Sequence, residues 1–371
     1  MLLLAAFLAQ SLWVIHRVPL RRAEADYAQA GMDQLAGRFL PRDFGTWPVP
    51  AIMAAAPVIA GRPFALLMSQ DVLKWLLRLP FVAIGWLLGA SIWYVARRLY
   101  GDAGGYVALT LYCFSPAVMF PWPGPLLTGS LGIFGTIFVA IAAAHTLYAP
   151  RAGAISELRS RWLRITMLGL AITLAAGSGS SAILPVALGL AFMLYLVPER
   201  RFSSLGLVLS ACGVAAVLLL ACCGFRPPAF AAMFAEANWL QFEHGTLVND
   251  VLRSYVSGIR HPENPLLLVF TAMALVGYFG WKRCRYFGNT APLLSLFVLT
   301  ALGLLAFADV LVGPFPFRAT PFLYVFTGGV FADLLESRFR NAFGLLLLGL
   351  LAAYAMVSVL AVARLRAGYG S

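Results

Sequence analysis

Two long stretches of this chain, residues 103–150 and 165–198, carry no formally charged side chain. A bilayer-spanning helix needs about 20 apolar residues, so each stretch is too long for a single crossing. Charged residues make up 11% of the sequence and hydrophobic residues 61%, whereas a soluble domain carries about 25% charge. The sequence therefore predicts an all-α, polytopic membrane protein, a helical bundle with no separate soluble domain.

Local helix breakers divide these stretches into separate spans. Proline cannot continue a helix interior, and segment 121–125 contains three prolines. Segment 177–181 consists of glycine and serine alone. We expect one domain over residues 1–371, with about 11 transmembrane helices of about 20 residues or fewer. Their expected ranges are 2–16, 79–96, 103–120, 126–147, 165–177, 182–197, 204–225, 265–281, 291–311, 319–335 and 343–363.

The distribution of basic residues predicts the orientation, because short cytoplasmic loops carry an excess of Lys and Arg. With a cytoplasmic N-terminus, the short outer connections contain only Arg318. The inner loops then contain Arg97, Arg98, Arg151, Arg159, Arg161, Arg164, Arg200, Arg201, Lys282, Arg283, Arg285, Arg338 and Arg340. We expect a bacterial inner (plasma) membrane protein whose long polar segments, 18–77 and 226–263, are extracytoplasmic loops with amphipathic helices.

The net charge of +12 does not indicate a nucleic-acid partner, because the arginines recur between hydrophobic spans and form no compact basic domain. No metal site is predicted either. Glu243-His244 has no second histidine four residues on, and the cysteines lack ligand spacing. We expect the cysteines to act as small apolar residues; they are Cys113, Cys212, Cys222, Cys223 and Cys284.

The segment that follows the first span combines arginines with two carboxylates, Glu24 and Asp26. If it is helical, one apolar stripe follows its length: Ala28, Met32, Leu35 and Phe39. The opposite, wetted face would carry Asp26, Gln29 and Asp33. Glu24 would then project to the apolar side, toward whatever the helix packs on. Alternatively, the two acids only offset the macrodipole in a first helical turn.

Several segments resemble the GT-C superfamily of integral membrane glycosyltransferases. The closest branch comprises the protein O-mannosyltransferases and the lipid A aminoarabinose transferases. The resemblance covers about residues 1–335 and rests on the following segments: 23–31 (AEADYAQAG), 77–81 (LRLPF), 96–101 (ARRLYG), Ser115-Pro116, 169–174 and 318–323. The usual catalytic Asp positions are not retained, since Ala23 and Gly124 stand where the family has acids.

The resemblance implies transfer of a sugar from a polyprenyl-phosphate donor to an acceptor at the outer membrane face. A carboxylate, Glu24 or Asp26, would take the proton of the acceptor. Arg318 would contact the donor phosphate, since arginine binds phosphate through two parallel hydrogen bonds. Asp309 would support Arg318 as its ion-pair partner, and His244 would help to shape the acceptor site. No further cofactor is implied, and a divalent metal requirement stays open.

A second interpretation is a catalytically inactive relative that keeps the fold as a structural subunit or scaffold of a membrane complex. Ala23 and Gly124 favour it, whereas Glu24, Arg318 and both outer loops favour transfer. A transporter is a third interpretation, but the spans lack paired charges at mid-membrane depth and clear repeats. The expected partners are membrane lipids, the polyprenyl-phosphate sugar and other membrane subunits, with no nucleic acid.

Overall fold

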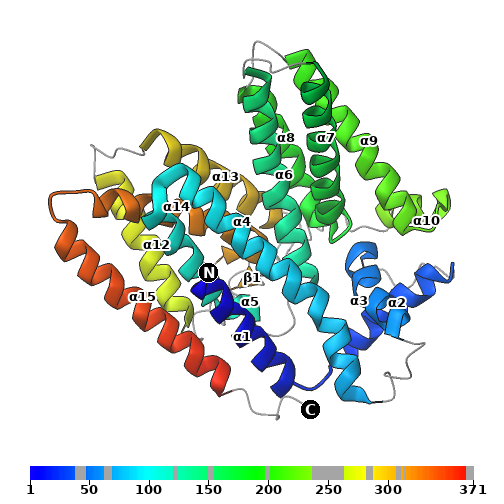
Figure 1. The fold of residues 1–371 in the computed structure, drawn as a ribbon, viewed down its shortest axis with the longest axis horizontal. Coiled ribbons are helices and arrows are strands. Elements are labelled where there is room, and N and C mark those ends of the chain that lie inside the picture. The colour runs from blue at the N-terminus through cyan, green and yellow to red at the C-terminus, as the bar shows by residue number, and fades with distance from the viewer. Residues whose placement is uncertain are drawn as a thin grey trace, which may run out of the picture. The chain divides into compact units, whose positions relative to one another are not determined.

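The structure, a computed structural model, describes residues 1–37, 47–61, 69–119, 124–148, 154–196, 201–235, 263–280, 287–305, 311–312 and 315–364. Over these ranges the fold is all-α, as predicted, apart from one pair of two-residue antiparallel strands. Figure 1 shows the labelled elements. Their bounds are α1 Leu2–Arg17, α2 Arg22–Leu35, α3 Pro48–Gly61, α4 Gln70–Cys113, α5 Pro116–Met119, α6 Gly124–Tyr148, α7 Ala154–Ala176, α8 Ile183–Leu196, α9 Arg201–Cys222, α10 Pro227–Ala235, α12 Glu263–Gly280, α13 Phe287–Leu305, β1 Leu311–Val312, β2 Phe315–Pro316, α14 Thr320–Leu335 and α15 Arg340–Ala363.

Within the described residues, four helices are long and apolar enough to cross a membrane: α4, α6, α9 and α15. α1 and α2 add a fifth crossing if they are counted as one broken span. Other predicted spans form shorter helices, such as α8 with 14 residues and α14 with 16. At 1.5 Å per residue these are roughly 21–24 Å long, less than the hydrocarbon core of about 30 Å. The chain is thus a membrane protein, but the predicted count of about 11 spans is not confirmed.

The chain divides into two compact units, each assembled from discontinuous segments. Unit 1 contains Met1–Pro19, Val82–Pro123 and Gln241–Ser371, and unit 2 contains Leu20–Phe81 and Gly124–Leu240.

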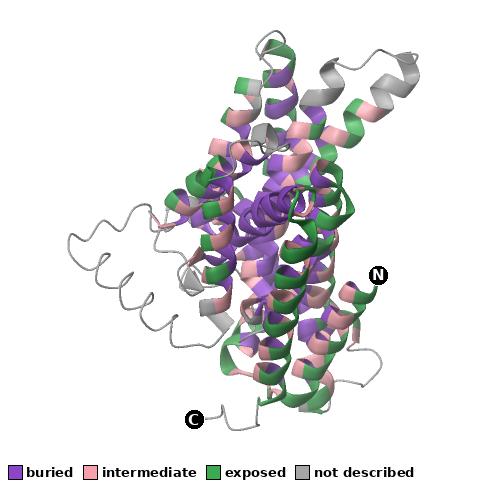
Figure 2. Cartoon of the chain, turned by 90° about the vertical axis from the view of Figure 1, so that its left-hand side faces the viewer, coloured by how far each residue is buried: buried purple, intermediate pink, exposed green. Residues whose placement is uncertain are grey.

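Helix α14 is the central element of unit 1. Every residue from Thr320 to Leu334 is buried, and Figure 2 shows this helix in purple and α15 in green over most of its length. α14 packs against α12, α13 and α15. It also meets α4, where a Cβ atom on Gly328 would lie 2.6 Å from the carbonyl oxygen of Gly104. Glycine at this crossing lets two backbones approach closely, as small residues do between membrane helices.

Helix α4 contains the break that the charge pattern predicts between residues 96 and 103. Gly101 has φ 77° and ψ −174°, which interrupts the helix, and glycine adopts positive φ without steric cost. An ion pair of 2.5 Å between Arg97 Nε and Asp102 Oδ1 spans this turn. The second half of α4 ends at Cys113 instead of reaching residue 120. Pro116 disfavours helical backbone geometry at the residue before it, Ser115.

Helices α6, α7 and α9 form much of unit 2 and pack in sequence, α6 on α7 and α7 on α9 (green in Figure 1). The first pair is very close, since a Cβ atom on Gly132 would lie 2.2 Å from the backbone nitrogen of Ala175. α7 ends at Ala176, a short 3-10 turn covers Ser180–Ala182, and α8 follows. The predicted break at residues 177–181 is confirmed.

Helix α3 was not predicted, because residues 48–61 fell inside the first polar segment. Their sequence, PVPAIMAAAPVIAG, contains no polar side chain. Proline is well tolerated at the start of a helix, where its missing N–H would have no partner in any case. Seven residues of α3 are buried, from Pro48 to Val58. An apolar helix therefore lies within a segment that was expected to be largely polar.

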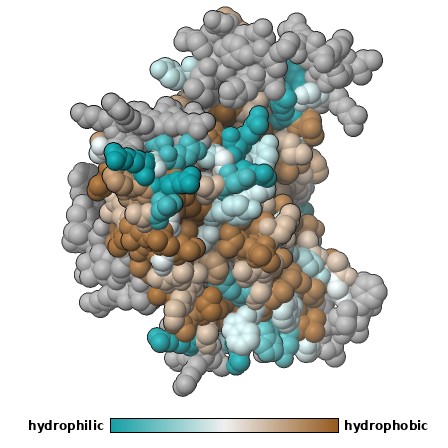
Figure 3. Space-filling model, turned by 60° about the vertical axis from the view of Figure 1, so that its left-hand side comes forward, coloured by the Kyte–Doolittle hydropathy of each residue, from teal (hydrophilic) through white to brown (hydrophobic). Residues whose placement is uncertain are grey.

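Large hydrophobic side chains are exposed on many helices, as expected for surfaces that face lipid. Figure 3 shows one face on which hydrophobic side chains cover the middle and hydrophilic side chains gather above and below. On α15 the exposed set includes Leu345, Leu348 and Met356, each at least 65% exposed. Exposed apolar area of this extent is unusual in soluble monomers.

We expect Gly132→Ala to destabilise unit 2, because the new methyl group overlaps the backbone of Ala175. Overpacking of this kind costs about 1–3 kcal/mol. The thermal unfolding midpoint of the purified protein in detergent measures the effect and should fall. Gly213→Ala in α9, where nothing lies within 4 Å of the new Cβ, is the matched control. Equal losses in both variants would contradict the close α6–α7 approach.

Candidate functional site

The most distinctive polar contact in unit 2 is a buried ion pair between Glu24 and Arg78. Arg78 Nε lies 2.7 Å from Glu24 Oε2, and Arg78 Nη2 lies 2.8 Å from Glu24 Oε1. Glu24 is 1% exposed and Arg78 is 5% exposed. Both carboxylate oxygens therefore accept hydrogen bonds from one guanidinium group, the bidentate geometry that gives arginine–carboxylate pairs their strength and direction.

Helix α2 positions Glu24 in its first turn. The buried face of α2 consists of Glu24, Ala28, Gly31 and Gln34, which recur every three or four residues, as one face of a helix requires. This face packs on α3. A Cβ atom on Gly31 would lie 2.1 Å from the carbonyl oxygen of Ala51, so only glycine permits the contact.

The C-terminal end of α2 is fixed to the end of α9. Gln34 Nε2 donates a hydrogen bond to the carbonyl oxygen of Cys222, and Arg226 Nη1 donates to the carbonyl oxygen of Gly37. Gly37 has φ 75°, the left-handed conformation that commonly ends a helix. The first polar segment therefore meets the start of the second.

Helix α3 is fixed to the end of α7. The backbone N–H of Val49 donates to the carbonyl oxygen of Gly177 at 3.1 Å. Val49 is also part of a buried cluster with Ala176 and Leu219. Together with the α2 contacts, these interactions anchor the α2–α3 pair to the C-terminal ends of α7 and α9.

The Glu24–Arg78 pair limits what Glu24 can do chemically. A general base must reach the proton that it removes, but the Glu24 carboxylate is buried and engaged at both oxygens. Asp26, two residues further along α2, is exposed. Of the two predicted catalytic carboxylates, Asp26 is therefore the one that an acceptor could reach without disrupting an ion pair.

The structure also gives a steric reason for glycine at position 124, the first residue of α6. A Cβ atom on Gly124 would lie 2.8 Å from the ring of Phe81. Phe81 follows Arg78 by three residues on α4, so its ring and the Arg78 guanidinium belong to the same helical turn. A carboxylate at position 124 would require this ring to move.

The predicted apolar stripe of α2 is confirmed at Ala28 and wrong at Leu35. Ala28 is buried, Met32 is half-buried and Leu35 is 51% exposed, while Phe39 lies outside the described residues. The prediction for Leu35 was wrong because α2 turns Gly31 and Gln34 toward α3 and α9 instead. On the opposite face, Gln29 donates to Asp33 Oδ2 at 3.0 Å.

Of the other predicted site residues, the structure describes Arg318. Arg318 belongs to unit 1, where it is 4% exposed in a short 3-10 turn, Phe317–Ala319, directly before α14. The β1–β2 pair precedes this turn, with Leu311 opposite Pro316. Asp309 and His244 lie outside the described residues. Among the residues that the structure describes, no group of three or more His, Cys, Asp or Glu side chains could hold a metal ion.

Sequence reasoning treated Arg78 only as part of a family-like segment and missed it as the partner of Glu24. One signal could have found it. A carboxylate turned toward an apolar interface needs an opposite charge, and Arg78 is the last charged residue before the span predicted at 79–96. The same logic does not separate Arg78 from Arg17, Arg21 or Arg22, so the pairing needed the structure.

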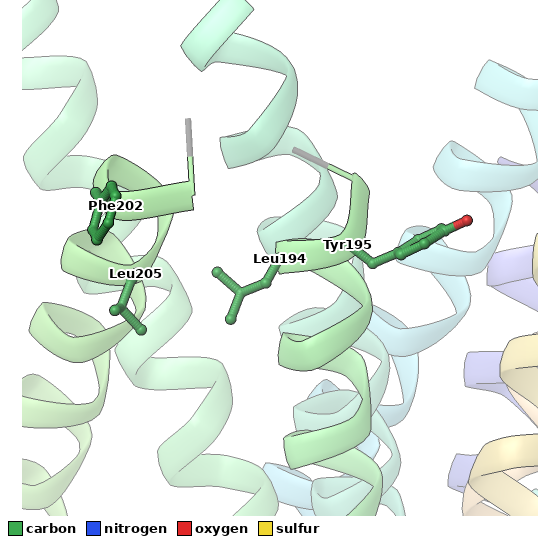
Figure 4. A pocket seen from close by; sticks show the side chains of 4 residues that line it. All are labelled: Leu194, Tyr195, Phe202 and Leu205. Carbon is green, nitrogen blue, oxygen red and sulfur yellow. The ribbon is translucent and has the colours of Figure 1, made fainter. Parts of the chain in front are cut away.

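An open apolar cavity of about 520 Å³ lies between the end of α8 and the start of α9, lined by Leu194, Tyr195, Phe202 and Leu205. Figure 4 shows Leu194 pointing toward α9, whereas Tyr195 points away from it. Phe202 is 91% exposed and Tyr195 is 75% exposed. Among these four side chains, Tyr195 alone carries a polar group.

No protein-family model matches the chain, and no curated protein matches it.

We expect Glu24→Ala and Arg78→Ala each to destabilise the protein strongly, since removal of one partner of a buried pair costs about 3–5 kcal/mol. The double variant Glu24→Leu/Arg78→Met should recover much of the loss, because apolar residues of similar volume replace such pairs at little cost. Thermal unfolding in detergent measures all three. Asp26→Ala, an exposed position, is the control and should change stability by less than about 0.5 kcal/mol. If the single variants unfold like the control, the pair does not stabilise α2.

Gly124→Ala should lower the unfolding midpoint because its methyl group meets the Phe81 ring. Adding Phe81→Leu should restore part of the loss by opening space at that ring. Gly135→Ala on the same helix is the matched control, since its Cβ would make an ordinary contact of 3.4 Å with Ala171. A double variant that is less stable than Gly124→Ala by the full cost of Phe81→Leu would argue against a direct steric conflict.

Proposed function

We propose that this membrane protein is a glycosyltransferase of the GT-C type, which moves a sugar from a polyprenyl-phosphate donor to an acceptor at the membrane surface. The observation that carries the proposal is the different environment of the two carboxylates on α2. Glu24 is buried and paired with Arg78, while Asp26 stays exposed on the same helix. Because the Glu24–Arg78 pair holds α2 in place, the Asp26 carboxylate stays accessible to a substrate.

In this proposal Asp26 is the general base. It accepts the proton of the acceptor hydroxyl or amine as that group attacks the anomeric carbon of the sugar, and the polyprenyl phosphate leaves. Glu24 and Arg78 act as positioning residues, because they fix the rotation of α2 about its axis. They also explain why a buried acid is found here without being the base.

Arg318, in unit 1, is a separate candidate for phosphate contact. It directly precedes α14, and the N-terminus of a helix carries partial positive charge and unpaired N–H groups that favour anions. Thr320, the first residue of α14, donates its hydroxyl to the carbonyl oxygen of Phe317, which fixes the short turn that carries Arg318. Both features support a phosphate site at this end of α14.

A second candidate function is that of a non-catalytic scaffold with the same fold. The packing of the Phe81 ring against Gly124 favours it, since no second carboxylate fits there without rearrangement. Ala23 favours it too, because the family places an acid at the equivalent position. In this case the protein would contribute its fold, and no single carboxylate would matter for sugar transfer.

Asp26→Asn distinguishes the two functions. Removal of a general base costs about 10²–10⁴-fold in rate, so a deletion strain complemented with Asp26→Asn should lose the glycan or glycolipid product, measured by mass spectrometry of lipid and protein extracts. Asp33→Asn, on the same helix, is the matched control and should retain the product. Immunoblotting of membranes checks that both variants accumulate equally.

Glu24→Gln serves a separate purpose in this experiment. It should lower the amount of protein in membranes rather than the activity per molecule.

The outcome for Asp26→Asn decides between the two functions. If this variant supports normal product at a normal protein level, while the deletion strain lacks the product, the protein acts as a scaffold and not as the transferase.

A further inference from the structure

Two exposed turns lie at the same end of unit 1. The first is the α4 turn around Gly101, and the second joins α14 to α15 at residues 336–340. They are neighbours because α4 and α14 touch just beside them. A Cβ atom on Gly329 would lie 2.6 Å from the Tyr100 ring, and one on Gly104 would lie 3.4 Å from Ala332. α14 then ends at Leu335, so the second turn follows the contact directly.

These turns carry an excess of positive charge. Four arginines of these turns are exposed: Arg97, Arg98, Arg338 and Arg340. Two acidic residues are exposed there, Asp102 and Glu336. Arg97 and Asp102 pair with each other. The other three arginines add their charge to a surface of the same sign.

The same end of unit 1 has the features of a membrane boundary. α15 is one of the helices that can cross a membrane, and it begins at Arg340. Its exposed side chains become apolar within the next turns, with Leu345 73% exposed and Leu346 49% exposed. On the α4 turn, Arg97 lies over the ring of Trp93 at 5.0 Å. Tryptophan beside arginine at the end of a span is typical of the headgroup level.

We propose that the α4 turn and the α14–α15 turn together form a binding surface for the headgroups of anionic phospholipids. The phosphate accepts hydrogen bonds from the guanidinium groups, since arginine contacts phosphate through parallel N–H donors. The acyl chains lie along the exposed apolar face of α15. This charge and this adjoining apolar surface fit a lipid better than a soluble anion, which would leave the apolar surface unused. The surface lies at the opposite end of α14 from Arg318.

Lipid titration followed by native mass spectrometry tests the proposal. The wild-type protein in a neutral detergent is titrated with phosphatidylglycerol, and with phosphatidylcholine as the zwitterionic lipid. We expect phosphatidylglycerol to bind more tightly, and Arg98→Gln/Arg338→Gln to weaken its binding by about fivefold for each arginine removed. Phosphatidylcholine binding should be unchanged. Arg364→Gln, which removes one exposed arginine at the other end of α15, is the control and should bind phosphatidylglycerol as the wild type does.

Three results would overturn the proposal. The first is equal affinity of wild type and Arg98→Gln/Arg338→Gln for phosphatidylglycerol. The second is an equal loss in the control variant, which would indicate only a nonspecific effect of net charge. The third is displacement of phosphatidylglycerol by soluble glycerol phosphate at similar concentration, which would indicate a site for the phosphate alone. Size-exclusion chromatography verifies that each variant remains folded.

Discussion

A carboxylate and a guanidinium can be buried together in unit 2 because each satisfies the other. The Glu24–Arg78 contact uses both oxygens of one group and two nitrogens of the other, which limits the cost of removing two charges from water. In a chain with 11% charged residues, such a pair is a strong directional restraint. It sets which face of α2 meets the protein, and hence which residues of α2 remain accessible.

Glycine sets the distances between helices in both units. Gly31 against Ala51, Gly132 against Ala175 and Gly328 against Gly104 each place a missing Cβ within 2.6 Å of another backbone atom. Between apolar helices in a membrane the hydrophobic effect contributes little, so close backbone packing and polar contacts decide the arrangement. The ion pair orients α2, and Gly31 then brings it onto α3. Neither contact alone would fix the helix.

Composition and helix breakers were sufficient to predict an all-α membrane protein and the break between α7 and α8. They failed where tertiary packing overrides local pattern. Leu35 belonged to a plausible apolar stripe, but the contacts of Gly31 and Gln34 turned α2 so that Leu35 became exposed. The predicted count of about 11 spans is not confirmed among the described residues, because apolar composition indicates a helix without giving its length. Burial of Glu24 followed from its position on the helix, whereas its pairing with Arg78 depends on contacts that the sequence does not encode locally.

The anchoring of α2 to α9 also affects the order in which the protein assembles. Arg78 follows Glu24 by 54 positions, but the contacts that hold the end of α2 join residues 188 and 189 positions apart. At a synthesis rate of about 5–20 residues per second, roughly ten to forty seconds separate the synthesis of the end of α2 from that of Cys222 and Arg226. During biogenesis Arg78 is therefore available to Glu24 well before Cys222 and Arg226 can contact the C-terminal end of α2. The C-terminal end of α2 therefore stays without these two contacts until α9 has been made.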